Sequence, residues 1–202
     1  MKKSLLIILF ILTCIPFTQA LFAEDDKRLL VAVVDFKNQT GDSENDSLAK
    51  GVTGSFINEL QKTKKFRIIE RERLESLLAE LKLNISGMVD SENAKEIGKQ
   101  LGVDAFVFGN LSAIKYSENK QTIFIMYTEA KKTEVSLDAR IVKVETGEVV
   151  ATADVITPVK NRRWVAFWFA KLGKTTDKNS TIREGIEVSS KKLAQNLAEQ
   201  IA

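Results

Sequence analysis

The chain has 202 residues, a formal net charge of +3 and no histidine. This length is typical of one domain that follows a targeting segment. The lack of histidine excludes a Ser-His-Asp triad, a histidine base and a histidine-ligated metal. Because the charge falls to +1 once Lys2 and Lys3 are removed, the sequence lacks the basic excess of a nucleic-acid-binding protein. We therefore expect no nucleic-acid partner, no metal and no cofactor.

The start of the chain has the pattern of a secretory signal peptide. Two lysines precede an apolar run at 5–12, and small residues favour cleavage after Ala20 or Ala23. The apolar run is too short for a permanent transmembrane helix, and an uncleaved anchor is the alternative. We therefore predict a signal peptide at 1–23 and an exported α/β domain at 24–202.

The first half of this domain alternates short apolar runs with segments of helical spacing. Apolar residues recur every three or four positions in the helical segments, as in Val52, Phe56 and Leu60. The connections are short, which is typical of a compact α/β layer. The expected strands are 29–34, 66–69 and 103–108, and the expected helices are 48–60, 74–81 and 92–101.

The ends of these helices carry capping residues. Asp46 or Ser47 is expected to cap the first helix, and Asp90 or Ser91 the third. Gly102 suits the position just after the third helix, where a left-handed backbone is common.

Two further glycines, Gly51 and Gly54, lie within the first helix. They lack the third glycine and the strand-to-helix turn of a phosphate-binding motif. We expect that they allow this helix to pack closely against a neighbour.

After Gly109 the apolar spacing changes from helical to alternating, which predicts an antiparallel meander. Polar turns are expected at 117–120, at 131–132 and at Thr146-Gly147. Pro158 is expected to end the last strand because it cannot donate to the ladder. The expected strands are 111–116, 122–127, 135–141 and 149–156, and a helix at 182–201 closes the chain. The predicted fold class is α/β, a mixed β-sheet with an antiparallel meander flanked by helices.

An aromatic flap or insertion is expected at about 158–180, where basic residues flank both tryptophans. Aromatic residues beside basic ones are favoured at membrane interfaces, and aromatics are also enriched at protein interfaces. Three of the aromatics would share one side if the segment were helical. The segment therefore predicts a contact with a membrane or with a protein partner. The candidate contact residues are Arg162, Arg163, Trp164, Phe167, Trp168 and Phe169.

Asp35, at a strand end, and Glu70, at a strand–helix junction, are the carboxylates best placed for acid–base chemistry. No second acid lies at a defined spacing from either. Such residues more often cap helices or pair with arginines such as Arg71. We therefore predict no catalytic residue and no enzymatic activity.

Several short motifs follow one another in a fixed order between Val31 and about Val155. They are Ile69-Glu70-Arg71, Leu74, Leu77-Leu78, Glu80, Leu83, Ser86-Gly87, Val89-Asp90, Ala94, Gly98, Leu101-Gly102, Gly109 and Thr146-Gly147-Glu148. Together they resemble the framework of the curli secretion channel family, CsgG. The resemblance implies a CsgG-like periplasmic domain and a non-enzymatic role in the cell envelope.

Members of that family assemble into a ring in the outer membrane and secrete curli subunits through long hairpins. The corresponding segments here are 117–133 and 157–180. The first is short for two membrane strands of about nine to eleven residues each, unless the flanking sheet strands lengthen, and the second alternates poorly. The resemblance implies a homo-oligomer with envelope protein partners and outer-membrane contact, exported to the periplasm or the outer membrane.

Two alternatives stand beside a secretion role. One is a soluble periplasmic module that regulates a partner protein, as the related activator lipoproteins of peptidoglycan synthases do. The other is a carboxylate enzyme that uses Asp35 or Glu70. Curli channel proteins are lipoproteins, so Cys14, the only cysteine, is a candidate for lipidation. The residue before it is Thr13 rather than a small residue, and cleavage after Ala20 or Ala23 would remove it.

Overall fold

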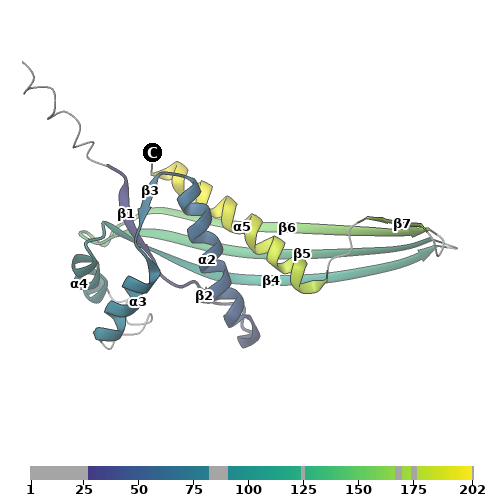
Figure 1. Cartoon of the computed structure of the whole chain (residues 1–202), viewed down its shortest axis with the longest axis horizontal. Helices are drawn as coiled ribbons and strands as arrows, with labels where there is room; N and C mark the ends of the chain where they lie inside the picture. The colour runs from purple at the N-terminus through teal and green to yellow at the C-terminus, as the bar shows by residue number, and fades with distance from the viewer. Residues whose placement is uncertain (1–26, 82–90, 124–125, 167–169, 174–176, 202) are drawn as a thin grey trace, which may run out of the picture.

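The computed structural model describes residues 27–81, 91–123, 126–166, 170–173 and 177–201 (Figure 1). Its strands are β1 (Leu29–Val33), β2 (Lys37–Asn38), β3 (Phe66–Ile68), β4 (Ala105–Ile123), β5 (Met126–Lys143), β6 (Val149–Ala166) and β7 (Ala170–Gly173). Its helices are α2 (Asp46–Lys62), α3 (Arg71–Glu80), α4 (Ser91–Leu101) and α5 (Lys178–Gln200), with a 3-10 turn η2 (Ser43–Asn45). The predicted signal peptide at 1–23 and Cys14 lie outside the described residues.

The strands form one mixed sheet in the order β3-β1-β4-β5-β6-β7, with β2 beside β4. Strand β1 pairs in parallel with β3 and β4, whereas β4, β5, β6 and β7 pair antiparallel in succession. This arrangement confirms the predicted mixed sheet with an antiparallel meander.

The sheet has a hydrophobic core on each face. Helices α2 and α5 pack on one face, where Phe56 and Leu193 are fully buried, and α3 and α4 pack on the other, around Ile97. Neighbouring residues of β1 point to opposite cores, so Val31 and Ala32 are both 0% exposed. This is why the first half of the chain shows continuous apolar runs.

The helix ends agree with the sequence in part. Gly102 follows α4 with φ +68°, and its N–H donates to the carbonyl of Lys99, which confirms its predicted role. Asp46 and Ser47 do not cap α2; they lie within its first turn, and Asn45 holds the cap position without a side-chain cap bond. The acidic cap in this region belongs to Asp42, whose carboxylate accepts from the N–H of Glu44 in η2.

The turns predicted at 117–120 and at 131–132 are wrong. Strands β4 and β5 run through both segments and pair with each other up to the pair Ile123–Met126. No glycine or proline interrupts either segment. Their polar residues instead form ion pairs within the sheet, such as Glu118 with Lys120 at 2.7 Å and Glu129 with Lys131 at 3.0 Å. The polar residues of these segments therefore indicate a strand whose two faces meet solvent, and they do not indicate a turn.

The expectation that Pro158 ends its strand is also wrong, since β6 runs to Ala166. The reason lies at Thr152, whose N–H and C=O both bind the side-chain amide of Gln200, at 3.1 and 2.8 Å, and therefore point away from β5. Backbone polar groups alternate sides along a strand, so the missing N–H of Pro158 also falls on the side away from β5. In the described part of the chain no strand lies on that side of Pro158, because β7 pairs only from Arg163 onward.

The close packing expected at Gly51 and Gly54 is wrong as well. Both glycines are exposed, and a Cβ built at either would have nothing within 4 Å. Helix α2 presents its other side to the sheet, through residues such as Val52 and Phe56. Close approaches occur instead at Gly109 against Phe36, and at two further glycines, Gly98 and Gly185.

Candidate functional site

The meander extends past the helical part of the molecule as an arm (Figure 1). We define the arm as residues 117–123, 126–132, 160–166 and 170–173 of strands β4 to β7. It begins where α5 begins, since Lys178 lies 5.8 Å from the ring of Tyr116. The hairpin segment that is short in sequence is therefore lengthened by its flanking strands.

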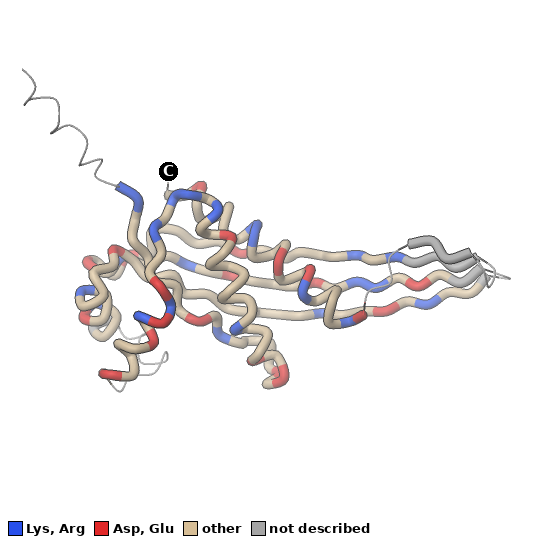
Figure 2. Tube along the Cα trace, viewed as in Figure 1, with Lys and Arg blue, Asp and Glu red and all other residues tan. Residues whose placement is uncertain are grey.

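Charged side chains lie along the arm (Figure 2). Because residues directly opposite each other share a face, Glu118 and Lys131 lie on one face, and Lys132 and Lys160 on the other. Hydrogen bonds between neighbouring charges shift their titration. The Lys120 ammonium lowers the pKa of Glu118, and the Glu129 carboxylate raises the pKa of Lys131. The arm therefore presents charge to solvent on both faces.

The far end of the arm has a different composition. The last rungs of the ladder join Ile123 to Met126 and Met126 to Ala166. The apolar residues Ile123, Met126 and Tyr127 therefore lie at the same end of the sheet as the described residues 164–166. Strand pairing over a long sequence separation brings them together, which periodicity alone does not reveal.

The predicted contact residues divide into two groups. Arg162, Arg163 and Trp164 lie in β6, so this part of the segment is an extended strand rather than a helix. Arg162 is exposed. Phe167, Trp168 and Phe169 lie outside the described residues.

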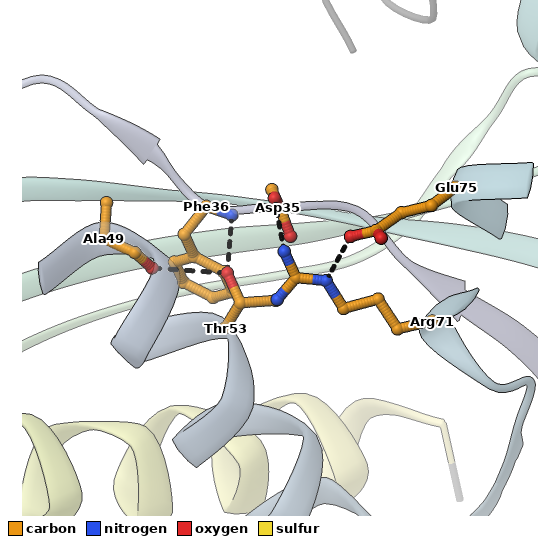
Figure 3. A network of polar contacts seen from close by, with 6 residues as sticks. All are labelled: Asp35, Phe36, Ala49, Thr53, Arg71 and Glu75. Carbon is orange, nitrogen blue, oxygen red and sulfur yellow. Dashed lines mark hydrogen bonds and ion pairs between the residues drawn. The ribbon is translucent and has the colours of Figure 1, made fainter. Parts of the chain in front are cut away.

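Asp35, the other sequence-based candidate, lies in a polar network just past β1 (Figure 3). Its carboxylate accepts from Nη2 of Arg71 at 2.8 Å, and Nε of Arg71 donates to Glu75 at 2.7 Å. The expected pairing with an arginine is thus confirmed for Asp35. Glu70 holds the cap position of α3 without a side-chain cap bond. The contact with Asp35 ties α3 to the end of β1, whereas the contact with Glu75 lies within α3.

Burial and neighbouring charges set the pKa of the Asp35 carboxyl. Partial burial raises the pKa of this carboxyl, the Arg71 guanidinium opposes the rise, and the Glu75 carboxylate adds to it. The folded state therefore binds a proton at Asp35 more readily than the unfolded chain does. Stability from this group is fully present below its unfolded pKa and is lost as pH rises through the raised folded pKa.

We predict that Asp35→Asn gains stability relative to the natural chain as the pH rises. The free energies of unfolding of the two proteins should differ least near pH 3, where Asp35 is protonated in both the folded and the unfolded state. As the pH rises to 7, the free energy of unfolding of the asparagine variant should increase relative to that of the natural chain. Urea unfolding of both proteins from about pH 3 to pH 7 measures the difference. A difference that moves the other way would mean that the attraction of Arg71 exceeds the cost of burial.

The described residues hold no group of three or more acidic, cysteine or histidine side chains arranged to bind a metal ion. Within the same residues, no helix combines the length and the apolar character that crossing a membrane requires.

The family model described as "Curli production assembly/transport component CsgG" matches residues 18–187. The match covers most of the chain. The chain belongs to the CsgG family. No curated protein matches it.

Several solved structures resemble this CsgG-family chain. The LpoB C-terminal domain from Salmonella enterica shares 18% identity, with 64% of this chain and 82% of that chain covered and a TM-score of 0.46. Lipoprotein GNA1162 from Neisseria meningitidis shares 14%, with 83% and 99% covered and a TM-score of 0.49. A PelC dodecamer from Paraburkholderia phytofirmans shares 14%, with 85% and 88% covered and a TM-score of 0.45. Likeness at this level assigns no ligand and no partner.

Sequence reasoning missed the continuous arm, although one signal for it was present. Apolar residues alternate from Ala151 through Val155 to Val159, past Pro158, and each of these three is buried. Alternation that continues beyond a proline indicates an edge strand rather than a strand end. The contact between Gln200 and Thr152 had no sequence signal, because the two residues meet only in the folded chain.

Proposed function

We propose that this protein is an exported, non-enzymatic component of the cell envelope. In this proposal it acts at the periplasmic side of the outer membrane, in the secretion or assembly of surface structures. Membership of the CsgG family and the signal-peptide pattern of 1–23 support it. The role requires no catalytic residue and no cofactor. The family also supports a homo-oligomer with envelope protein partners.

The observation that carries the proposal is the arm. It extends the sheet beyond the helices, and its ladder ends among apolar residues of both hairpins. Tryptophan and arginine together are favoured where protein meets the surface of a bilayer. We propose that the end of the arm makes the outer-membrane contact. The residues of this contact are Arg162, Arg163, Trp164, Phe167, Trp168 and Phe169.

A second candidate function is a soluble periplasmic module that regulates a partner protein without forming a pore. The charges on both faces of the arm favour it, since a strand exposed to lipid needs an apolar face. The length of the arm favours it too. Each of 117–123 and 126–132 adds about seven residues, fewer than the nine to eleven that cross a bilayer.

Envelope fractionation of the full-length chain separates these functions. We expect the natural chain to stay with the outer membrane through an alkaline carbonate wash, and a variant carrying Trp164→Ser and Trp168→Ser to wash off. Val149→Ser, which removes an apolar side chain that is 55% exposed outside the arm, is the matched control and should be retained. Equal retention of the tryptophan variant would contradict the proposed contact.

The same fractions also distinguish the mode of attachment. A natural chain that washes off and remains small in mild detergent would rule out a pore and favour the regulatory module. A Cys14→Ala variant that alone washes off would assign the attachment to a lipid on Cys14. A large detergent-stable ring would instead support secretion.

A further inference from the structure

Strand β6 has an open edge between two covered segments. At one end the amide of Gln200 occupies the N–H and C=O of Thr152, and at the other end β7 pairs from Arg163 onward. Between them, no strand in the described part of the chain pairs with the side of β6 away from β5. The backbone groups of Asp154, Ile156 and Lys160 face this side, in phase with Thr152. An exposed strand edge is a template for pairing with another chain.

Two charged side chains of this edge lie opposite side chains of the same charge within one copy of the chain. Asp154 lies directly opposite Asp138, and Lys160 directly opposite Lys132. These are pairs of the kind whose strands come closest, because the backbone groups of β6 at these positions point away from β5. Like charges directly opposite each other destabilise a sheet.

The inner members of these pairs already have partners. Asn110 donates to Asp138 at 2.6 Å, and Lys132 lies 2.6 Å from Glu134. Within the part of the chain that the structure describes, neither Asp154 nor Lys160 has an opposite charge within ion-pair distance. Asp154 therefore faces its own sign across the strands, and Lys160 faces Lys132 while the Glu134 carboxylate attracts it from a greater distance.

Two further residues of the edge lack a suitable environment. Ile156 is 66% exposed, one of two large apolar side chains so exposed among the described residues. Thr157 is only 2% exposed, yet its hydroxyl has no hydrogen-bond partner in the described structure. The hydroxyl of Thr133, which lies in β5 away from the edge, is also buried and unpaired, so this feature is not specific to the edge.

We propose that two copies of the chain pair antiparallel through residues 154–160 of β6, around a two-fold axis at Thr157. Asp154 then lies opposite Lys160 of the second copy, and Ile156 lies opposite Pro158 of the second copy. Because the axis repeats each contact, both aspartates meet lysines and both isoleucines are covered. The two Thr157 residues lie directly opposite each other at the axis.

The alternation of the backbone limits the other registers. Only even-numbered residues present backbone groups to the edge, so the register shifts in steps of two. One step in either direction places Asp154 opposite Pro158 or Arg162 and leaves Lys160 without its aspartate. The paired segment also fits between Thr152, which Gln200 occupies, and Arg163, where β7 begins. Pro158 has no backbone N–H, so one inter-strand hydrogen bond is missing in each copy. The backbone N–H groups of Asp154 and Lys160 remain available for pairing.

This pairing goes beyond the proposed function, because two arms that point in opposite directions cannot both contact the same membrane; it names a surface and its partner, a second copy. It does not rest on the membrane contact. In such a dimer the two arms point in opposite directions, because the paired strands are antiparallel. Self-association is therefore measured on purified full-length chain in mild detergent without lipid, where loss of the membrane contact has no effect.

Charge exchange tests the register by sedimentation equilibrium. Asp154→Lys and Lys160→Asp should each raise the dimer Kd about tenfold or more, because each sets like charges against each other twice. The double exchange should restore the natural Kd. Asp154→Lys also removes the like-charge pair with Asp138 inside the subunit, so its Tm should not fall. A chain that is monomeric at all concentrations, or a Kd unchanged by single exchange, overturns the proposal.

Cysteine cross-linking tests the position of the axis. In a Cys14→Ala background, Thr157→Cys should form a disulfide between copies under mild oxidation, because identical residues meet at the axis. Thr133→Cys is the control: Thr133 is equally buried on the same face but lies in β5, away from the edge. A disulfide at both positions, or at neither, contradicts an axis at Thr157.

Discussion

Replacing Gly109 by alanine is expected to lower the free energy of unfolding by about 1–3 kcal/mol. A methyl group at this position would overlap the ring of Phe36, which lies against the backbone of β4. Phe36 is 3% exposed and packs on Phe56 with ring centroids 5.2 Å apart, so its ring cannot move without disturbing the core. Urea unfolding measures the loss.

A double-mutant cycle identifies the cause. Phe36→Leu alone should be destabilising, but combined with Gly109→Ala it should cost less than the sum, because the smaller side chain leaves room for the methyl group. Gly54→Ala is the matched control, since that helical glycine is exposed and has nothing within 4 Å of a Cβ. It should gain about 0.5–1 kcal/mol. Two alanine variants that behave alike would show that Phe36 does not require Gly109.

Gly109 also shows where sequence patterns carry information. The change from helical to alternating spacing at this residue predicted the meander, because periodicity reports which side chains are buried. The start of the meander was misplaced, since β4 runs from Ala105 through Gly109 and pairs with β5 from its first residue, which joins the expected strands 103–108 and 111–116. The same signal placed β1, β3 and the four helices close to their observed bounds. All of these elements lie in the body of the molecule, where one face or both meet a core.

The arm breaks this link between polarity and local structure. Its strands extend beyond the helices, so both faces of the sheet are exposed to solvent there. The polar residues of 117–120 therefore have the composition of a turn although they belong to a strand. Composition cannot separate a solvated strand from a loop; only the ladder between β4 and β5 does so. For the same reason the aromatic segment could be located, but not the pairing of its residues 164–166 with the end of β5.

The pairing of Asp35 with Arg71 could be anticipated because both residues flank element ends that meet in an α/β layer. The remainder of that region could not. A buried threonine hydroxyl in the middle of a helix gives no periodic signal, yet the Thr53 hydroxyl contacts Phe36 just beyond β1 as well as Ala49 within α2 (Figure 3). Helix α2 is tied to the chain after β1 at Phe36, and helix α3 at Asp35.

Thr53→Val is therefore expected to cost about 1–3 kcal/mol of stability, although the two side chains have nearly the same shape. The Thr53 hydroxyl accepts from the N–H of Phe36 at 3.0 Å and donates to the carbonyl of Ala49 at 3.2 Å, and the side chain is 0% exposed. Valine leaves the Phe36 N–H buried without an acceptor. Urea unfolding measures the cost, and hydrogen exchange of the Phe36 amide locates it.

Thr53→Ser separates the hydrogen bond from packing. Serine keeps the oxygen and loses only the methyl group, so the Phe36 amide should stay protected even though the smaller side chain costs some stability. In Thr53→Val the packing is preserved and the Phe36 amide should exchange faster. If the amide stays protected in both variants, another acceptor serves Phe36 and the tie between α2 and β1 is apolar. Because the same amide adjoins Asp35, its protection also reports whether α2 and α3 hold this part of the chain together.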